Sequence, residues 1–189
     1  MTTPHRIDRL SEHIVTIEGL FTPDECDALV GLAEGIGFGA APISTGHGFE
    51  MAPEVRNNTR VMLDDLPRAE ALWRRLGPWT PGRRAFEAVG LNERLRFYRY
   101  APGQYFRWHR DGSFQRQTGE RSLFTAMVYL NDDFGGGATE FDVADEKLAI
   151  VPARGMVLLF EHLLRHQGAP VLRGSKYVLR SDVMFRAAA

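Results

Sequence analysis

The chain has 189 residues, of which 44% are hydrophobic and 25% charged, and its formal net charge is -1. This length fits one domain of roughly 100–200 residues, and the charge balance gives no support to binding of nucleic acid or an anionic membrane through bulk charge. The single cysteine, Cys26, excludes an intramolecular disulfide and a cysteine-based zinc site. The chain shows neither an apolar run of membrane-spanning length nor an N-terminal segment of signal-peptide type. We therefore expect a cytoplasmic protein without a membrane segment.

The N-terminal part begins with alternating predictions of strand and helix. Residues 13–18 are mostly apolar and β-branched, which predicts a short strand. Thr22 is a favourable N-cap, Pro23 suits the first helical turn, and Glu25 completes a capping box. We therefore expect a helix from about Pro23 to Glu34, with Cys26 on its buried face.

A loop and two further helical segments are expected before residue 95. Residues 40–58 are rich in glycine, proline and polar residues and predict a long loop, a length typical of functional lids. Leu72, Trp73 and Leu76 predict the buried face of a helix over 67–76, and residues 83–89 also favour a helix.

The C-terminal half has the pattern of an all-β structure. Short apolar, aromatic and β-branched segments alternate there with Gly, Asp and Asn turn signals, which favours a sandwich or barrel over βαβ units. The expected strands cover residues 95–101, 105–110, 123–131, 139–143, 147–151, 156–161, 165–171 and 176–186.

A candidate metal site begins with the triplet His109-Arg110-Asp111. Residues i and i+2 of a strand point to the same face, so this imidazole and carboxylate can bind one cation. A third ligand, His162 or His166, would complete a facial triad of the non-haem iron type, which leaves positions open for substrates. His166 lies in a strand-like segment and is the better candidate, whereas His162 is expected to begin a loop. The pair alone is a weak signal, since Asp111-Gly112 is also a good turn dipeptide.

The last predicted strand has one unusual face. Lys176, Arg180 and Asp182 are separated by even numbers of residues, so they lie on one face of the strand. The alternation of charged and apolar residues, taken alone, favours a solvent-exposed face. The functional interpretation is a barrel interior that binds an anion, because a buried Lys or Arg needs a partner. Tyr100 and Tyr129 lie where such a pocket would use a phenol, although each is also compatible with an ordinary half-buried aromatic.

An ordered set of motifs resembles the Fe(II)- and 2-oxoglutarate-dependent dioxygenases of the prolyl 4-hydroxylase group. The set covers roughly residues 95–186, and its order is more specific than any single element. In chain order it comprises Tyr100-Ala101-Pro102-Gly103-Gln104-Tyr105, His109-Arg110-Asp111, Tyr129-Leu130-Asn131, Gly136-Gly137-Ala138-Thr139-Glu140-Phe141, Val151-Pro152-Ala153-Arg154-Gly155 and His166-Gln167-Gly168-Ala169-Pro170-Val171, followed by Gly174 and Lys176-Tyr177.

The resemblance implies a mainly β fold with an α+β N-terminal part. Its core would be a double-stranded β-helix, the cupin-like jelly roll, buttressed by N-terminal helices. Residues 1–189 would then form a single dioxygenase domain. Within it, residues 1–94 would supply the helical support and lid, and residues 95–186 the catalytic core.

The resemblance also implies the ligands and co-substrates. His109, Asp111 and His166 would bind Fe(II) and so form the catalytic centre. Tyr100, Tyr129 and Lys176 would hold 2-oxoglutarate, and Arg180 would shape that end of the pocket. O2 would be the oxidant, with ascorbate as a supporting reductant. The carboxylate at Asp111 favours hydroxylation over halogenation, because related halogenases have a small residue there.

The substrate is left open between a peptidyl group, such as a prolyl residue, and a free amino acid or other small molecule. Arg56, Asn58 and Arg60 would share a face of a strand leading out of the long loop, and the resemblance implies substrate contact there; a solvated edge strand is equally compatible. The alternative functions are a cupin-type metalloenzyme and a non-catalytic binding module, neither of which would use 2-oxoglutarate. The oligomeric state has no sequence signal.

Overall fold

The computed structural model describes residues 5–45, 48–143 and 146–188. Two of the three expected helices are present, α1 at Pro23–Ile36 and α2 at Leu66–Leu76. The Thr22 capping box is confirmed, since the Thr22 side chain accepts from Glu25 N and the Glu25 side chain accepts from Thr22 N. Cys26 is fully buried. Asp65 caps α2 by accepting a hydrogen bond from Arg68 N.

Most of the chain forms strands, many of them short. The strands before residue 95 begin with β1 (Arg6–Ser11), β2 (Ile14–Glu18), β3 (Gly39–Ala40), β4 (Ile43–Thr45), β5 (Gly48–Glu50), β6 (Thr59–Asp64), β7 (Phe86–Leu91) and β8 (Arg94–Tyr100). Those that follow are β9 (Phe106–His109), β10 (Arg121–Tyr129), β11 (Gly135–Gly136), β12 (Thr139–Val143), β13 (Glu146–Ile150), β14 (Val157–Glu161), β15 (Arg165–Gly168), β16 (Val171–Arg173) and β17 (Lys176–Ala187).

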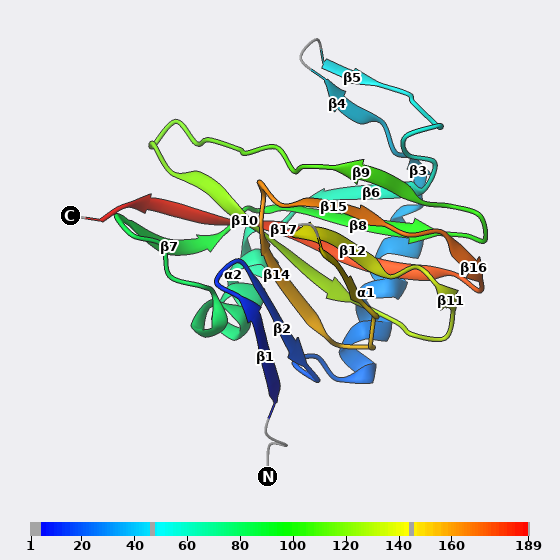
Figure 1. Ribbon diagram of the computed structural model, residues 1–189, viewed down its shortest axis with the longest axis horizontal. Coiled ribbons are helices and arrows are strands. Elements are labelled where there is room, and N and C mark those ends of the chain that lie inside the picture. The colour runs from blue at the N-terminus through cyan, green and yellow to red at the C-terminus, as the bar shows by residue number, and fades with distance from the viewer. Residues whose placement is uncertain (1–4, 46–47, 144–145, 189) are drawn as a thin grey trace.

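The double-stranded β-helix is confirmed by the way successive strands alternate between two sheets. The larger sheet has the order β1-β2-β14-β10-β17-β8-β6-β3, with β7 paired to the end of β17, and the smaller has the order β13-β12-β15-β9. Strands β8, β10, β14 and β17 of the jelly roll therefore lie in the larger sheet, and β9, β12, β13 and β15 lie in the smaller one (Figure 1).

Two hydrophobic clusters fill the molecule, one on each face of the larger sheet. The first joins the helices to that sheet and includes Cys26, Leu72 and Leu76. The second lies between the two sheets and includes Tyr100, Tyr129, Phe141 and Phe160. The helices thus support one face of the sheet while its other face lines the barrel, as the resemblance implied.

Three details differ from the sequence-based expectations. The segment expected to be helical over 83–89 instead forms β7, because it pairs with the end of β17, from Leu91↔Val183 to Phe86↔Ala187. The long loop over 40–58 contains the β4–β5 hairpin, and its residues 46–47 lie outside the described part of the chain. The strand expected over 55–61 begins only at Thr59.

The face of β17 that the period alone assigned to solvent is buried. Lys176 is 3% exposed and Asp182 is 2% exposed, and Arg180 is only partly accessible. The strand lies between β10 and β8 in the sheet, with the helical cluster on one face and the barrel interior on the other, so both of its faces are covered.

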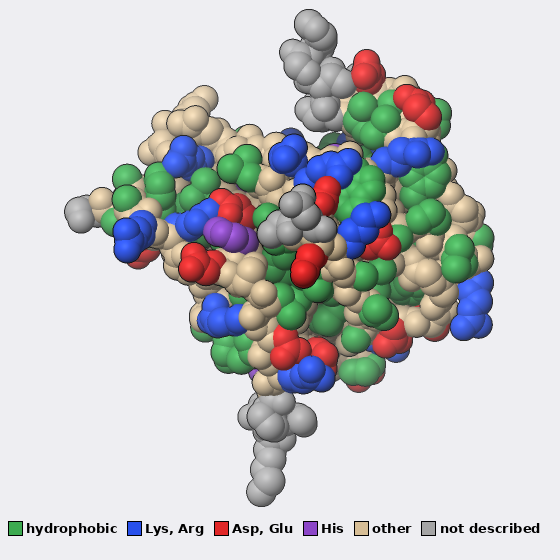
Figure 2. Space-filling model, viewed as in Figure 1, with side chains coloured by type: hydrophobic (Ala, Val, Ile, Leu, Met, Phe, Trp, Pro, Cys, Tyr) green, Lys and Arg blue, Asp and Glu red, His purple; other side chains and the backbone are tan. Residues whose placement is uncertain are grey.

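Charged side chains of both signs are interspersed over the face of the molecule seen in Figure 2. This agrees with the near-zero net charge. Neither helix in the described part of the chain is long and apolar enough to cross a membrane.

Candidate metal centre

Three side chains from two strands converge at one end of the barrel. His109 ends β9, Asp111 follows two residues later, and His166 lies in β15, directly opposite His109 in the β15–β9 register. One potential ligand atom from each of these residues lies within 4.8 Å of the others. The two His Nε2 atoms are each 3.6 Å from a carboxylate oxygen of Asp111. The structure therefore brings together the three residues that the resemblance implied as ligands, and it does not bring His162 into the group.

The imidazole rings are held so that Nε2 is the nitrogen available to a metal. His109 Nδ1 lies 2.7 Å from the Arg107 carbonyl oxygen, and His166 Nδ1 lies 2.9 Å from that of Leu164. A carbonyl can only accept, so both rings carry their proton on Nδ1, which is the usual support for a metal-binding imidazole. Phe106 stacks on the His109 ring with centroids 3.5 Å apart. Two imidazoles and one carboxylate with these orientations fit an Fe(II) ion of the facial-triad type.

The Asp111 carboxylate is buried but strongly stabilised in its charged form. Burial alone raises the Asp111 pKa, but the Arg180 guanidinium and the two histidines outweigh it, so the pKa lies well below its usual range. Arg180 Nη1 is 2.9 Å from Asp111 Oδ1, and burial lowers the His166 pKa to about 4. The site is thus ready to bind a cation without first losing protons.

A hydrogen-bonded chain behind Asp111 was missed by the sequence analysis. Thr125 Oγ1 donates to Asp111 Oδ2 over 2.6 Å and lies 3.0 Å from His162 Nδ1. Because the only Thr125 proton points to Asp111, His162 Nδ1 must donate to Thr125, and His162 Nε2 then accepts from Ser122 Oγ over 2.9 Å. Burial lowers the His162 pKa, which agrees with a neutral ring. The sequence places His162 after a strand and contains no signal that it is buried.

The basic group at the other end of the site is Lys176. It is buried, and its Nζ lies 5.5 Å from the ring centre of Tyr100 and 5.2 Å from that of Tyr129. Nζ donates a 2.6 Å hydrogen bond to the carbonyl of Gly137. No carboxylate pairs with Lys176 in the described part of the chain, and burial lowers its pKa to about 7. Burial also raises the pKa of Tyr100 to about 12.

A narrow cavity of about 30 Å³ connects these two ends of the site. It is lined by the three candidate ligands together with Tyr98, Tyr100, Met127, Thr139, Lys176 and Arg180, among others. Tyr129 does not line it, but its hydroxyl is 2.6 Å from Thr139 Oγ1 and so holds a lining side chain.

A group of arginines surrounds Tyr98 at the side of this cavity. The Arg56 guanidinium lies 4.5 Å from the ring centres of both Tyr98 and Phe106, and its Nε donates to Asn58 Oδ1 over 2.7 Å. Arg56 Nη2 is buried without a hydrogen-bond partner. Arg56 and Asn58 are thus buried rather than on a solvated edge. Burial lowers the pKa of the neighbouring Arg60.

Arg96 is a further member of this group that the sequence analysis did not select. Its Nη1 lies 3.0 Å from Asp182 Oδ2, and Asp182 also contacts Arg180. Arg96 shares a face of β8 with Tyr98 and Tyr100, so its parity with Tyr100 in the sequence is a signal that could have identified it.

A jelly roll with two imidazoles and a carboxylate at one end has the architecture and donor set of the non-haem Fe(II) oxygenases. Residues 95–181 match the family model described as the 2OG-Fe(II) oxygenase superfamily. This part of the chain is similar to that superfamily, and the curated relatives that the chain matches are prolyl 4-hydroxylases.

The sequence relatives are distant and longer than this chain. Prolyl 4-hydroxylase 1 of Arabidopsis thaliana is 23% identical over 196 residues, covering 88% of this chain and 67% of the relative. A putative prolyl 4-hydroxylase of Acanthamoeba polyphaga mimivirus is 31% identical over 113 residues, covering 50% of this chain and 45% of the relative.

Solved structures share the fold over nearly the whole chain. A prolyl 4-hydroxylase from Pseudomonas putida has a TM-score of 0.68 at 18% identity, covering 93% of this chain and 95% of that chain. A Trichoplax adhaerens prolyl hydroxylase, solved with a hypoxia-inducible-factor peptide fragment, has a TM-score of 0.72 at 13% identity, covering 93% of this chain and 84% of that chain.

Proposed function

We propose that this chain is a 2-oxoglutarate-dependent Fe(II) hydroxylase acting on an amino-acid or peptidyl substrate. The observation that carries the proposal is a pairing of two features at opposite ends of one narrow cavity. One is the group of His109, Asp111 and His166, and the other is the buried Lys176, which has no carboxylate partner in the described part of the chain. A cation site facing a buried, unpaired ammonium suits a metal together with a dicarboxylate.

Each residue has a distinct role in this proposal. His109, Asp111 and His166 hold Fe(II) through two Nε2 atoms and a carboxylate oxygen. Lys176 donates to the carboxylate of 2-oxoglutarate farthest from the metal. Tyr100 forms the wall beside Lys176, and Tyr129 packs near Lys176 Nζ and holds the lining side chain of Thr139. Arg180 Nη1 lies 2.9 Å from the Asp111 carboxylate and fixes its orientation. Arg180 also borders the co-substrate.

When bound, the iron, 2-oxoglutarate and O2 supply the oxidation: one oxygen atom enters a substrate C–H bond as a hydroxyl, and succinate and CO2 leave. The protein itself contributes position and exclusion of water. Phe106 and Phe160 pack against the two histidine rings and keep their orientation fixed. Thr125 holds Asp111 from behind. Small displacements of such groups cost large factors in rate, because the reacting atoms must be held in near-contact geometry.

A peptidyl or free amino-acid substrate agrees with the names of the relatives, which are prolyl hydroxylases. One solved neighbour is described as a complex with a peptide fragment. We assign substrate contact to Arg56, Asn58 and Arg60, which lie beside the Tyr98 wall of the cavity. The unpartnered Arg56 Nη2 supports this assignment, since a buried donor without a partner is costly.

We further propose that residues 1–189 act as one unit. Residues 1–94 support the larger sheet and cover the site, and residues 95–186 carry the chemistry. A reducing compartment such as the cytoplasm suits a ferrous site, and ascorbate would serve there as an auxiliary reductant.

The two alternative functions are less well supported. A cupin-type metal site generally uses more histidines, but His162 is bonded to Thr125 and Ser122 and does not face the metal group. Either alternative would also leave Lys176 buried without a function.

The decisive experiment is an anaerobic titration of metal-free protein with Fe(II) and 2-oxoglutarate, followed by the weak visible charge-transfer absorption of the chelate. We expect a saturable band in the wild type and in His5→Gln, a control at a histidine just before β1, and no band in His166→Ala. A folded, Fe(II)-binding protein that gives no band on adding 2-oxoglutarate would contradict the proposal.

A further inference from the structure

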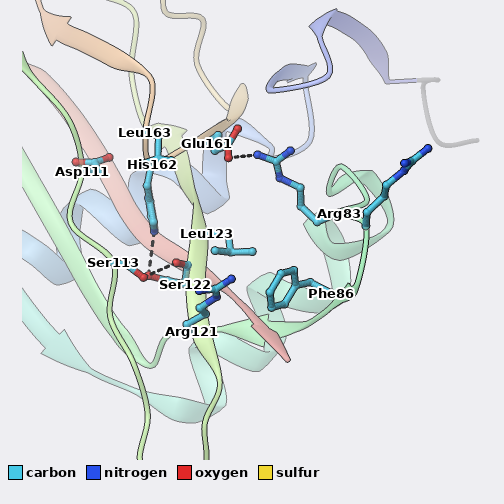
Figure 3. A pocket seen from close by; sticks show the side chains of 11 residues that line it. Arg83, Phe86, Asp111, Ser113, Arg121, Ser122, Leu123, Glu161, His162 and Leu163 are labelled. Atoms are coloured by element: carbon cyan, nitrogen blue, oxygen red, sulfur yellow. Dashed lines mark hydrogen bonds and ion pairs between the residues drawn. The ribbon is translucent and has the colours of Figure 1, made fainter. Parts of the chain in front are cut away.

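A second and much larger cavity lies on the other side of Asp111. Its volume is about 470 Å³, within the roughly 300–1,000 Å³ of small-molecule sites. Figure 3 shows Asp111 at one end and Arg83 toward the other, with Glu161, His162 and Leu163 along one edge. Asp111 also lines the narrow cavity, so the two cavities meet at this residue.

The floor of the large cavity is polar and internally satisfied. His162 and Ser122 are buried there and bonded to each other over 2.9 Å. The Ser122 oxygen also accepts a 2.8 Å hydrogen bond from Phe114 N. These groups therefore offer little binding capacity to a ligand, and they form a rigid base next to Asp111.

The walls of the large cavity are apolar. Phe86, Leu123 and Leu163 line it, and Leu163 is 71% exposed. Apolar walls of this kind suit the carbon skeleton of a substrate rather than a charged group.

The rim of the large cavity carries an excess of positive charge. Arg83, Arg84 and Arg121 all line it, and among the described residues that line it Glu161 is the only acidic one besides Asp111. Glu161 is already paired with both Arg83 and His13. Arg84 and Arg121 form no ion pair with any acid in the described part of the chain. The Arg121 guanidinium instead lies over the Phe86 ring, 4.4 Å from its centre. Two cations at the mouth thus lack an anionic partner.

We infer that this cavity is the part of the substrate cleft that selects a substrate bearing a carboxylate. This inference rests on the proposed function and specifies its substrate class. Arg84 and Arg121 pair with the carboxylate at the rim, because guanidinium groups match the planar geometry of that anion. The aliphatic part of the substrate lies along Phe86, Leu123 and Leu163, which directs its C–H bonds toward Asp111 and the metal group. Both a free amino-acid derivative and an acidic side chain in a peptide present this chemistry.

The test measures binding, separately from turnover. ¹⁵N-labelled protein, saturated with Zn(II) in place of iron and with 2-oxoglutarate, is titrated at constant ionic strength. The first pair of probes is N-acetylglutamate and its neutral diamide, N-acetylglutamine amide. The second pair is the capped peptides acetyl-Ala-Glu-Ala-amide and acetyl-Ala-Gln-Ala-amide. Amide shifts at residues 113, 121–123 and 161–163 report occupancy of the large cavity.

We expect at least one carboxylate probe to shift these amides and to bind about tenfold more tightly than its amide isostere, as a charge-assisted hydrogen bond provides. A preference for the free acid or for the peptide identifies which source the cleft accepts. In Arg84→Gln and Arg121→Gln this preference falls severalfold, whereas in Arg173→Gln, an exposed arginine of β16, it is unchanged.

The inference would be overturned if the acid and the amide bound equally well. It would also be overturned if the Arg84→Gln/Arg121→Gln double variant kept the preference for the carboxylate probe. If the proposed function were wrong, a different result would appear: adding 2-oxoglutarate would not shift the amide signals of residues around Lys176. The two hypotheses therefore fail separately. Wild-type-like spectra of the variants show that any loss of binding is not a loss of folding.

Discussion

Thr125 donates a 2.6 Å hydrogen bond to Asp111 Oδ2, and both residues are buried. The hydroxyl belongs to the middle of β10 in the larger sheet, and it is itself held by His162. The carboxylate is therefore oriented from both sides, by Thr125 on Oδ2 and by Arg180 on Oδ1. Such outer contacts typically determine how well a metal ligand is presented.

The first prediction concerns this contact. Thr125→Val keeps the shape of the side chain but removes the hydroxyl, leaving His162 Nδ1 and Asp111 Oδ2 without this partner. We expect the affinity for Fe(II) to fall by about 10-fold or more, the range seen for outer-shell partners of metal ligands. Anaerobic competition with a chelator measures this affinity, and Thr125→Ser serves as the control that keeps the hydroxyl. Equal affinities in Val and Ser variants would contradict the role of Thr125.

The second prediction follows from the Lys176 pKa, which burial lowers to about 7 in the ligand-free protein. Between that value and the ordinary lysine pKa near ~10.4, the unfolded chain binds more protons than the folded one. The contribution of Lys176 to stability is thus fully present above the unfolded pKa and is lost as the pH falls toward 7. A bound dicarboxylate favours the charged amine, so 2-oxoglutarate binding at about pH 8.5 is expected to take up close to one proton.

Calorimetry in buffers of different ionisation enthalpy measures this proton uptake directly. Lys176→Met is the matched variant, because it keeps the length of the side chain without its amine. We expect Lys176→Met to lose the proton uptake and to bind 2-oxoglutarate far more weakly. Binding without any proton uptake in the wild type would show that Lys176 remains charged before the ligand arrives.

The third prediction concerns the buried charges around Arg180. Its two Nη atoms lie 2.9 Å from Asp111 Oδ1 and 3.3 Å from Asp182 Oδ1. Arg180→Met leaves Asp111 without its strongest cationic neighbour, so we expect metal-free protein to lose about 3 kcal/mol of unfolding free energy. Arg186→Met, which breaks an exposed pair with Glu87, is the control and is expected to cost less than about 1 kcal/mol. Urea unfolding of both variants tests the contrast, and similar losses would argue against it.

The grouping of His109, Asp111 and His166 near Lys176 could be predicted from the sequence because ordered motifs contain these residues, and the structure brings them to one cavity. The capping box of α1 was equally accessible, since its contacts are local. In contrast, β7 was expected to be a helix, because the residues that make it a strand lie about a hundred positions later in β17, as in the Arg186↔Glu87 pair. The burial of His162 and Arg96 also depends on how distant strands meet. The sequence correctly placed Lys176, Arg180 and Asp182 on one face of β17. The burial of that face could not be predicted, because it depends on how the two sheets close around the strand.

The last prediction tests the packing that joins the helical layer to the barrel. Gly155 lies in the turn before β14 with φ +77°, and a Cβ there would collide with the Phe21 carbonyl oxygen. Its neighbours are backbone atoms: Phe21 N donates to the Gly155 carbonyl over 3.1 Å, and Gly155 N donates to the Tyr129 carbonyl over 2.8 Å. Gly155→Ala therefore combines an unfavourable backbone conformation with a clash that no side-chain rotation relieves. We expect a loss of roughly 2–5 kcal/mol in unfolding free energy.

Gly119→Ala separates the two contributions, because Gly119 has φ +94° but a Cβ there would meet nothing within 4 Å. We expect this control to lose only the conformational part, about 1–2 kcal/mol. Urea unfolding of the two variants at one pH gives the difference, which measures the contact between the turn before β14 and the start of the helical layer. If Gly155→Ala lost no more unfolding free energy than Gly119→Ala, Phe21 would lie farther from this turn than the structure shows. The N-terminal layer would then support the barrel less closely.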